Sequence, residues 1–169
     1  DIAQKNSNKL AIIIDNKRYN YKYLENKSFK VSKYFMNNLK LRPGDVVALD
    51  STKCIATYIF LIACLRIGVA YVFIDPDNPK VRINKILKSV KPKFFFSKEQ
   101  KKSNNYSNFV KTVSFKKIIS FLNKGKPNIK KDFPSFPSTN IAYIMFTSGS
   151  TGEPKGAAIS HNNLLNFIS

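Results

Sequence analysis

Three of the six glycines in this chain of 169 residues fall within eight positions near its end, directly after an apolar run. The run is Ile141–Phe146, and the segment that follows reads TSGSTGEPKG from Thr147 to Gly156. β-branched and aromatic residues in the run predict a buried strand. Glycine lets backbone amides approach a ligand closely, so the pattern indicates a loop held at the end of that strand.

The glycine-rich segment also carries the donors that a polyphosphate requires. Its glycines remove side-chain bulk, so that backbone N–H groups can converge on an anion. Four hydroxyls and one ammonium group supply the other donors. The residues that we predict to bind phosphate are Thr147, Ser148, Gly149, Ser150, Thr151, Gly152, Lys155 and Gly156.

This segment is not a Walker A loop. That motif requires Gly-Lys followed by Ser or Thr, whereas Lys155 stands before Gly156. The residues 157–159 predict a short strand, and a helical pattern starts only at 162. We therefore expect a strand–loop–strand arrangement without a helix dipole aimed at the phosphates. The alternative is a flexible Ser/Gly/Thr linker, which the embedded Pro-Lys-Gly and the preceding strand disfavour.

Strands and helices alternate along the rest of the chain and predict an α/β fold with a parallel or mixed sheet. A hairpin with an Asp15-Asn16 turn is expected over 10–21. Tyr19, Tyr21, Tyr23 and Phe94–Phe96 are expected in the core. The segment 97–139 is predicted to be variable and loop-rich. The other expected helices are 21–39, 53–67, 80–90 and 116–123, and the other strands are 46–49, 69–74, 94–96 and 110–115.

Composition limits the partners that this chain can have. The net charge of +19 allows a non-catalytic basic module that binds polyanions. The lysines are scattered and far outnumber the arginines, so no specific nucleic-acid partner is expected. Cys54 and Cys64 have no metal-ligand spacing and predict free thiols in a reducing, cytoplasmic compartment. Gly68 divides the apolar run 54–74 into a helix and a strand, so no membrane span is expected.

Three segments resemble motifs of the adenylate-forming (AMP-binding) superfamily. IAYIMFTSGSTGEPKG at 141–156 resembles its phosphate-binding signature. RYNYKYL at 18–24 resembles its early L-T-Y-x-E-L element. LRIGVAYVFID at 65–75 resembles L-K-A-G-x-A-Y-V-P-I-D. The resemblance covers nearly the whole chain, and its middle element favours the amino-acid-activating branch. That branch includes nonribosomal peptide synthetase adenylation domains and D-alanine–carrier protein ligases. The departures, at Ile67, Phe73, Phe146 and Ala157, are apolar exchanges that leave the loop chemistry intact.

The resemblance implies that residues 1–169 are a truncated N-terminal subdomain of one adenylation domain. Such enzymes use ATP and Mg²⁺ to convert a carboxylate, here an amino acid, into its acyl-adenylate with release of pyrophosphate. A carrier-protein or coenzyme A thiol then accepts the acyl group. The family's ribose-binding aspartate, substrate pocket and late lysine would lie beyond Ser169. We therefore expect no catalytic residue or metal ligand in this piece, and no activity from it alone. An acyl-CoA synthetase-type ligase remains an alternative. His161 is expected to be a cap or surface residue without a catalytic role.

Overall fold

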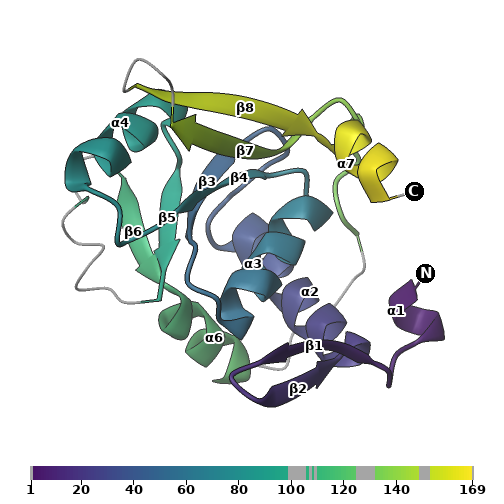
Figure 1. Ribbon diagram of the computed structural model, residues 1–169. Coiled ribbons are helices and arrows are strands. Elements are labelled where there is room, and N and C mark those ends of the chain that lie inside the picture. Colours follow the sequence, from purple (N-terminus) through teal and green to yellow (C-terminus); the bar gives the residue numbers. More distant parts are fainter. Residues whose placement is uncertain are drawn as a thin grey trace.

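The chain forms a large mixed sheet with helices on both faces and a small separate hairpin (Figure 1). The computed structural model describes residues 2–98, 106, 108, 110–124, 132–148 and 153–168. The helices are α1 Ile2–Lys5, α2 Tyr21–Asn37, α3 Ile55–Arg66, α4 Lys80–Val90, α6 Phe115–Lys124 and α7 His161–Ile168. The strands are β1 Leu10–Ile14, β2 Lys17–Asn20, β3 Val46–Asp50, β4 Ala70–Ile74, β5 Phe94–Ser97, β6 Lys111–Ser114, β7 Ile141–Ser148 and β8 Pro154–Ser160.

Within the described residues, the large sheet has the strand order β6-β5-β3-β4-β7-β8. Every neighbouring pair is parallel except β7 and β8, which run antiparallel. The predicted mixed α/β sheet is therefore confirmed. The five strands β3, β4, β5, β6 and β7 all run parallel, so their carboxyl ends lie at one edge of the sheet. Ligands of α/β folds bind at this edge.

Two layers of apolar side chains, one on each face of the sheet, pack the sheet against its helices. Alternate side chains of β3 point to opposite faces, with Val47 and Leu49 on one face and Ala48 on the other. The first layer joins the sheet to α2, α3 and α6, and Phe35 stacks on Phe96 there with ring centroids 4.8 Å apart. The second layer joins the opposite face to α4.

The end of α3 shows why the long apolar run folds as a helix and then a strand. Gly68 has φ +67°, which L side chains rarely adopt, and it follows the C-cap Ile67. The N–H of Val69 donates to the carbonyl of Cys64 at 3.1 Å, and the N–H of Gly68 donates to that of Leu65 at 3.4 Å. This bond pattern is a Schellman motif, so Gly68 ends the helix as predicted and turns the chain into β4.

The N-terminal hairpin also matches its prediction. Asp15 and Asn16 both have positive φ, 50° and 60°, as a two-residue type I′ turn requires. Asn20 ends β2 and caps α2, since its side-chain oxygen accepts a hydrogen bond from the N–H of Tyr23 at 2.8 Å.

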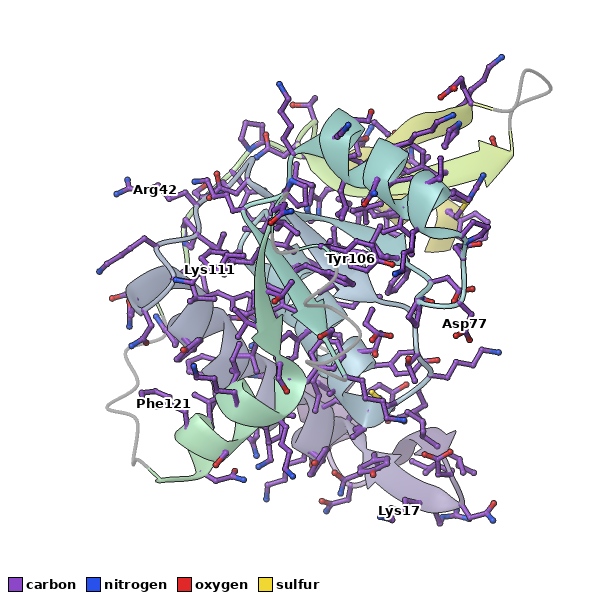
Figure 2. The ribbon with its side chains drawn as sticks, turned by 90° about the vertical axis from the view of Figure 1, so that its left-hand side faces the viewer. Lys17, Arg42, Asp77, Tyr106, Lys111 and Phe121 are labelled. Atoms are coloured by element: carbon purple, nitrogen blue, oxygen red, sulfur yellow. The ribbon has the colours of Figure 1, made fainter. Side chains whose placement is uncertain are left out.

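Inside the predicted loop-rich segment 97–139, the expected strand 110–115 and helix 116–123 are confirmed as β6 and α6. β6 extends the sheet beside β5, and α6 packs into the first apolar layer. Tyr106 is 5% exposed and lies against the face that α4 covers (Figure 2). Phe133, near the end of the segment, lies over α2 and α3, where Arg66 sits 5.4 Å from its ring centroid. Residues 99–105 and 125–131 lie outside the described residues.

Candidate functional site

The glycine-rich segment joins the last two strands of the sheet. β7 and β8 pair in the register Phe146–Gly156, Thr147–Lys155 and Ser148–Pro154. The strand–loop–strand arrangement is confirmed, because strand precedes and follows the segment and α7 begins only at His161. The two strands reach further than expected, so that residues predicted in the loop, at 147–148 and 154–156, extend the hairpin. Pro154 stands at the first position of β8, which suits a residue without an N–H.

Thr147 and Lys155 are cross-strand partners, so their side chains leave the same face of the hairpin. Both residues are exposed. Alternation along the strands places two exposed apolar residues on that same face, Phe73 at 41% exposure and Met145 at 55%. Their apolar character indicates only burial, so no signal in the sequence marks these two residues as part of the site. A hydroxyl, an ammonium group and an apolar surface thus lie together at the carboxyl edge.

The other half of the predicted site lies outside the described residues: Gly149, Ser150, Thr151 and Gly152. Ser148 is described as the last residue of β7. Of the eight predicted phosphate-binding residues, the structure therefore brings four together at the open end of one hairpin: Thr147, Ser148, Lys155 and Gly156.

Gly156 has a packing role that its sequence context does not indicate. A Cβ at this position would stand 2.9 Å from Cζ and 3.1 Å from Cε1 of Phe146. The Phe146 ring also packs against the apolar layer beneath α4. Gly156 therefore serves close aromatic packing as well as backbone openness.

Glu153 is held by α4 rather than by the neighbouring lysine. Its carboxylate accepts a hydrogen bond from Lys85 Nζ at 2.5 Å, with the glutamate side chain 64% exposed. Glu153 thus faces solvent and is also paired with α4. Because Glu153 is paired with Lys85, and no described carboxylate forms a salt bridge with Lys155, the Lys155 charge is available to an anion.

His161 is not the cap of α7, which corrects one part of the expectation, and the residue is half-buried. Ser160 is the cap of α7: its Oγ accepts a hydrogen bond from the N–H of Asn163 at 3.1 Å. The His161 ring packs on Phe136 with centroids 4.9 Å apart, and its Nε2 is buried without a hydrogen-bond partner among the described residues. Burial lowers the pKa of His161 because desolvation disfavours the imidazolium. The structure supports a packing role for this residue.

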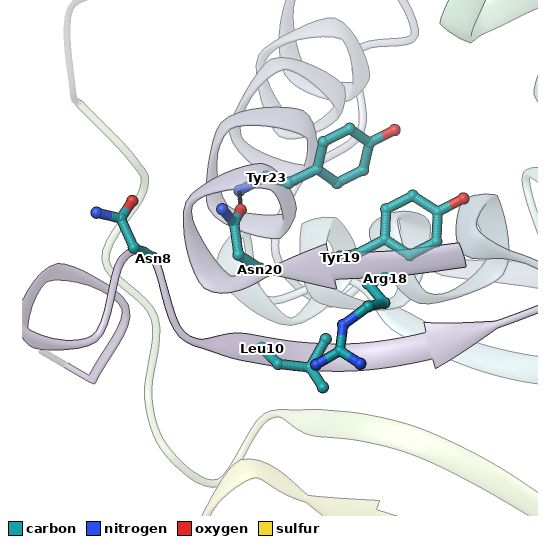
Figure 3. A pocket seen from close by; sticks show the side chains of 6 residues that line it. All are labelled: Asn8, Leu10, Arg18, Tyr19, Asn20 and Tyr23. Carbon is teal, nitrogen blue, oxygen red and sulfur yellow. Dashed lines mark hydrogen bonds between the residues drawn. The ribbon is translucent and has the colours of Figure 1, made fainter. Parts of the chain in front are cut away.

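A separate hollow of about 400 Å³ lies at the N-terminal hairpin (Figure 3). The rings of Tyr19 and Tyr23 border it with centroids 5.0 Å apart, and Arg18 lies on the other side of β2 near Leu10. Phe95 and Phe96 are buried as predicted, and the half-buried Tyr23 and Phe94 pack against the first apolar layer. Tyr19 and Tyr21 are half-buried and stand outside both apolar layers, so their placement in the core is wrong. The Asn20 cap and the aromatic contact explain this cluster as the joint between hairpin and α2.

The fold and the hairpin define an α/β domain whose glycine-rich segment joins an antiparallel strand pair at the edge of a mostly parallel sheet. Residues 1–169 match the family model described as AMP-binding enzyme, and the chain belongs to that family of adenylate-forming enzymes.

Similar curated proteins are nonribosomal peptide synthetases. Surfactin synthase subunit 2 of Bacillus subtilis is 34% identical over 128 residues, which cover 74% of this chain and 3% of that protein. Tyrocidine synthase 1 of Brevibacillus parabrevis is 28% identical over 165 residues, which cover 95% of this chain and 14% of that protein. The chain thus spans a small part of these relatives.

Solved structures share the fold. The N-terminal subdomain of Klebsiella oxytoca NpsA, in complex with 3-hydroxybenzoyl-AMSN, has a TM-score of 0.80 at 24% identity. The match covers 95% of this chain and 39% of that one. The o-succinylbenzoate CoA synthetase MenE of Bacillus subtilis has a TM-score of 0.84 at 19% identity, over 98% and 33% of the two chains. In the described part of the chain, no helix has the length and apolar character to cross a bilayer.

Proposed function

We propose that this chain is the opening part of an ATP-dependent ligase that activates an amino acid as its aminoacyl-adenylate and releases pyrophosphate. A carrier-protein thiol would then accept the aminoacyl group. The observation that carries the proposal is the β7–β8 hairpin, which places the exposed Thr147 and Lys155 side by side at the carboxyl edge of the sheet. Membership of the AMP-binding family supports ATP as the nucleotide.

In this proposal the glycine-rich segment holds the phosphate groups that leave as pyrophosphate. Hydroxyls of Thr147, Ser148, Ser150 and Thr151 donate hydrogen bonds, and the glycines at 149, 152 and 156 let backbone amides approach. The ammonium group of Lys155 offsets the phosphate charge. The contribution is positioning and electrostatic stabilisation of the leaving group, with no covalent role for these residues.

Mg²⁺ would arrive with the nucleotide. The described residues contain no cluster of three His, Cys, Asp or Glu side chains that could hold a metal ion. Mg²⁺ in nucleotide sites is bound largely by substrate phosphates and water, with one or two protein carboxylates. The donors at the hairpin suit the phosphates of such a complex.

We propose an amino acid as the substrate and a carrier-protein thiol as the acceptor because of the proteins that this chain resembles. The curated matches are peptide synthetases, and one structural neighbour is an artificially fused adenylation–PCP di-domain. The neighbour named as a CoA synthetase keeps the acyl-CoA branch as the alternative.

The test is ATP–pyrophosphate exchange by the full-length protein that carries this chain, with each of the twenty amino acids. We expect one or a few amino acids to support exchange. Lys155→Ala should lower kcat/KM for ATP by about 10- to 100-fold, which corresponds to one to three kcal/mol of lost transition-state stabilisation. The matched control is Lys17→Ala, because Lys17 is exposed and lies at the far end of the molecule from β8 (Figure 2).

Two outcomes would overturn the proposal. If Lys155→Ala leaves ATP–pyrophosphate exchange unchanged, the hairpin has no role in binding the phosphates of the nucleotide. Absence of exchange with any amino acid, together with binding to nucleic acid that falls steeply with salt and survives Lys155→Ala, would favour the basic polyanion-binding module instead. We expect the 169-residue piece alone to show negligible exchange.

A further inference from the structure

A second hollow, of about 770 Å³, lies at the carboxyl ends of β3, β5 and β6. This volume is within the range of about 300–1,000 Å³ that is typical of small-molecule sites. Its wall is formed where the chain leaves each of these strands. The lining residues are Cys54, Ile55 and Ala56 at the start of α3, Lys98 after β5, and Phe115, Lys116, Ile119, Ser120 and Asn123 from α6.

The hollow lies where the strand order of the sheet produces a crevice between β3 and β5. β3 and β5 are adjacent parallel strands, yet the next described residues that pack on the sheet after each of them lie on opposite faces. After β3 the chain enters α3 in the first apolar layer, whereas after β5 it carries Tyr106 into the second. Ligands of open α/β sheets bind at such points, outside the carboxyl ends of the strands.

The hollow is separate from the glycine-rich segment. That segment follows β7, and β4 lies between β7 and β3 in the sheet. Neighbouring strands are about 4.8 Å apart, so two such steps separate β3 from β7. A ligand in the hollow therefore contacts α3 and α6 rather than the β7–β8 hairpin.

The lining combines an apolar wall with positive charge. Ile55, Ala56, Phe115 and Ile119 supply apolar surface, and none of the lining residues is acidic. Lys98 and Lys116 are exposed, and neither forms a salt bridge with another described residue. α3 starts at this wall with no acidic residue in its first turn. An anionic group is thus favoured at the lysines.

The two lysines are free to meet a ligand because their local structural roles use only backbone atoms. The N–H of Lys98 donates to Asp50 Oδ2 at 3.1 Å, and the N–H of Lys116 donates to Ser114 Oγ at 3.2 Å. The nearby acid, Asp50, is occupied: its other carboxylate oxygen accepts hydrogen bonds from the N–H of Thr52 at 2.8 Å and from its hydroxyl at 2.5 Å.

We propose that this hollow binds a free medium-chain aliphatic carboxylate, with the chain against the α3–α6 wall and the carboxylate between Lys98 and Lys116. The site is additional to the proposed nucleotide site and does not depend on it.

Cys54 provides a reporter inside the hollow. It lines the wall and is partly exposed, whereas Cys64 is 0% exposed in the core. A thiol reagent should therefore modify Cys54 in the native protein and leave Cys64 unmodified. The tryptic peptide from Cys54 to Arg66 contains both, so fragmentation of one peptide measures the reporter and its internal control together.

The experiment measures the rate of iodoacetamide modification of Cys54 in the full-length protein as decanoate is added below its micelle-forming concentration. We expect protection that saturates. Affinity should rise by up to about fourfold per methylene from hexanoate to decanoate, as burial of each CH₂ predicts. Decyltrimethylammonium, which carries the same chain with the opposite charge, should protect at least tenfold more weakly. Lys98→Met with Lys116→Met should remove the preference for the anion, since both backbone hydrogen bonds remain.

Equal protection by the anion and the cation would overturn the proposal, because it would indicate non-specific apolar adsorption. Absence of protection by decanoate would overturn it as well. ATP–pyrophosphate exchange is measured in parallel: loss of exchange in Lys155→Ala with intact decanoate protection separates this site from the nucleotide site.

Discussion

The ring of Phe146 lies against the backbone of Gly156, its cross-strand partner on β8, so closely that a Cβ on Gly156 would stand 2.9 Å from Cζ of the ring. The φ angle of Gly156 is not positive, so the site does not demand glycine for its backbone conformation. The requirement is purely one of space, imposed by a half-buried ring beside the glycine-rich segment.

Gly156→Ala should therefore destabilise the protein through its contact with Phe146. Overpacking of this kind costs about 1–3 kcal/mol. We expect a lower midpoint of chemical denaturation, and a smaller loss when Gly156→Ala is made in a Phe146→Leu background. The coupling between the two positions is measured by a double-mutant cycle.

Gly44→Ala is the matched control for that experiment. Gly44 has φ +88° and open space around its Cβ position, so its substitution strains the backbone without creating a clash. Phe146→Leu should leave the cost of Gly44→Ala unchanged. If the Phe146→Leu background lowered the cost of both glycine substitutions equally, the packing explanation would be contradicted.

Two ion pairs in the chain should differ in their contribution to stability. Arg66 pairs with Glu25 at 2.5 Å, is 17% exposed, and lies 5.7 Å and 5.4 Å from the ring centroids of Phe29 and Phe133. Arg66→Met should cost about 1–2 kcal/mol through lost cation–π and charge-assisted contacts. Lys85→Met, which breaks the exposed pair with Glu153, should cost less than about 1 kcal/mol. Equal losses in thermal denaturation would contradict this ranking.

Most of the fold was predictable because each element carries its own local signal. Gly68 ends α3 and Asp15-Asn16 turns the first hairpin where the sequence predicts, since these residues favour positive φ. The strand Phe94–Ser97 is apolar enough to stand out by itself. In each case, the signal and the structure that it specifies lie within a few residues of one another.

The extent of the site was not predictable by the same means. Ser and Gly disfavour strands and dominate the sequence after Phe146, so the signal for β7 stops there, although cross-strand pairing carries the strand to Ser148. Likewise, the contact between Gly156 and Phe146 and the pair between Glu153 and Lys85 depend on tertiary placement. The residue types of the segment predict its chemistry, but the side chains that pack against it come from elsewhere in the fold.

His161 should make stability depend on pH. Desolvation lowers its pKa in the folded state, so the unfolded chain binds the proton more readily between the folded value and the ordinary value of about 6.5. Stability should therefore fall as pH drops below about 6.5. His161→Gln should show a smaller decrease, measured as the difference in Tm between pH 7.5 and pH 5.5. Identical pH profiles for the two proteins would show that His161 does not titrate with folding.

Thr147 and Lys155 should act as a unit on the nucleotide, because they are cross-strand partners on one exposed face. Thr147→Val removes a hydroxyl donor and Lys155→Met removes the charge, while neither change disturbs a buried group. Each should raise KM for ATP or lower kcat in pyrophosphate exchange without lowering Tm. If both side chains contact the same phosphate group, the double variant should lose less than the sum of the two, with a coupling of about 0.5–3 kcal/mol. Full additivity would mean that the two side chains act on different groups of the substrate, and the site would then extend along the hairpin rather than close around one phosphate.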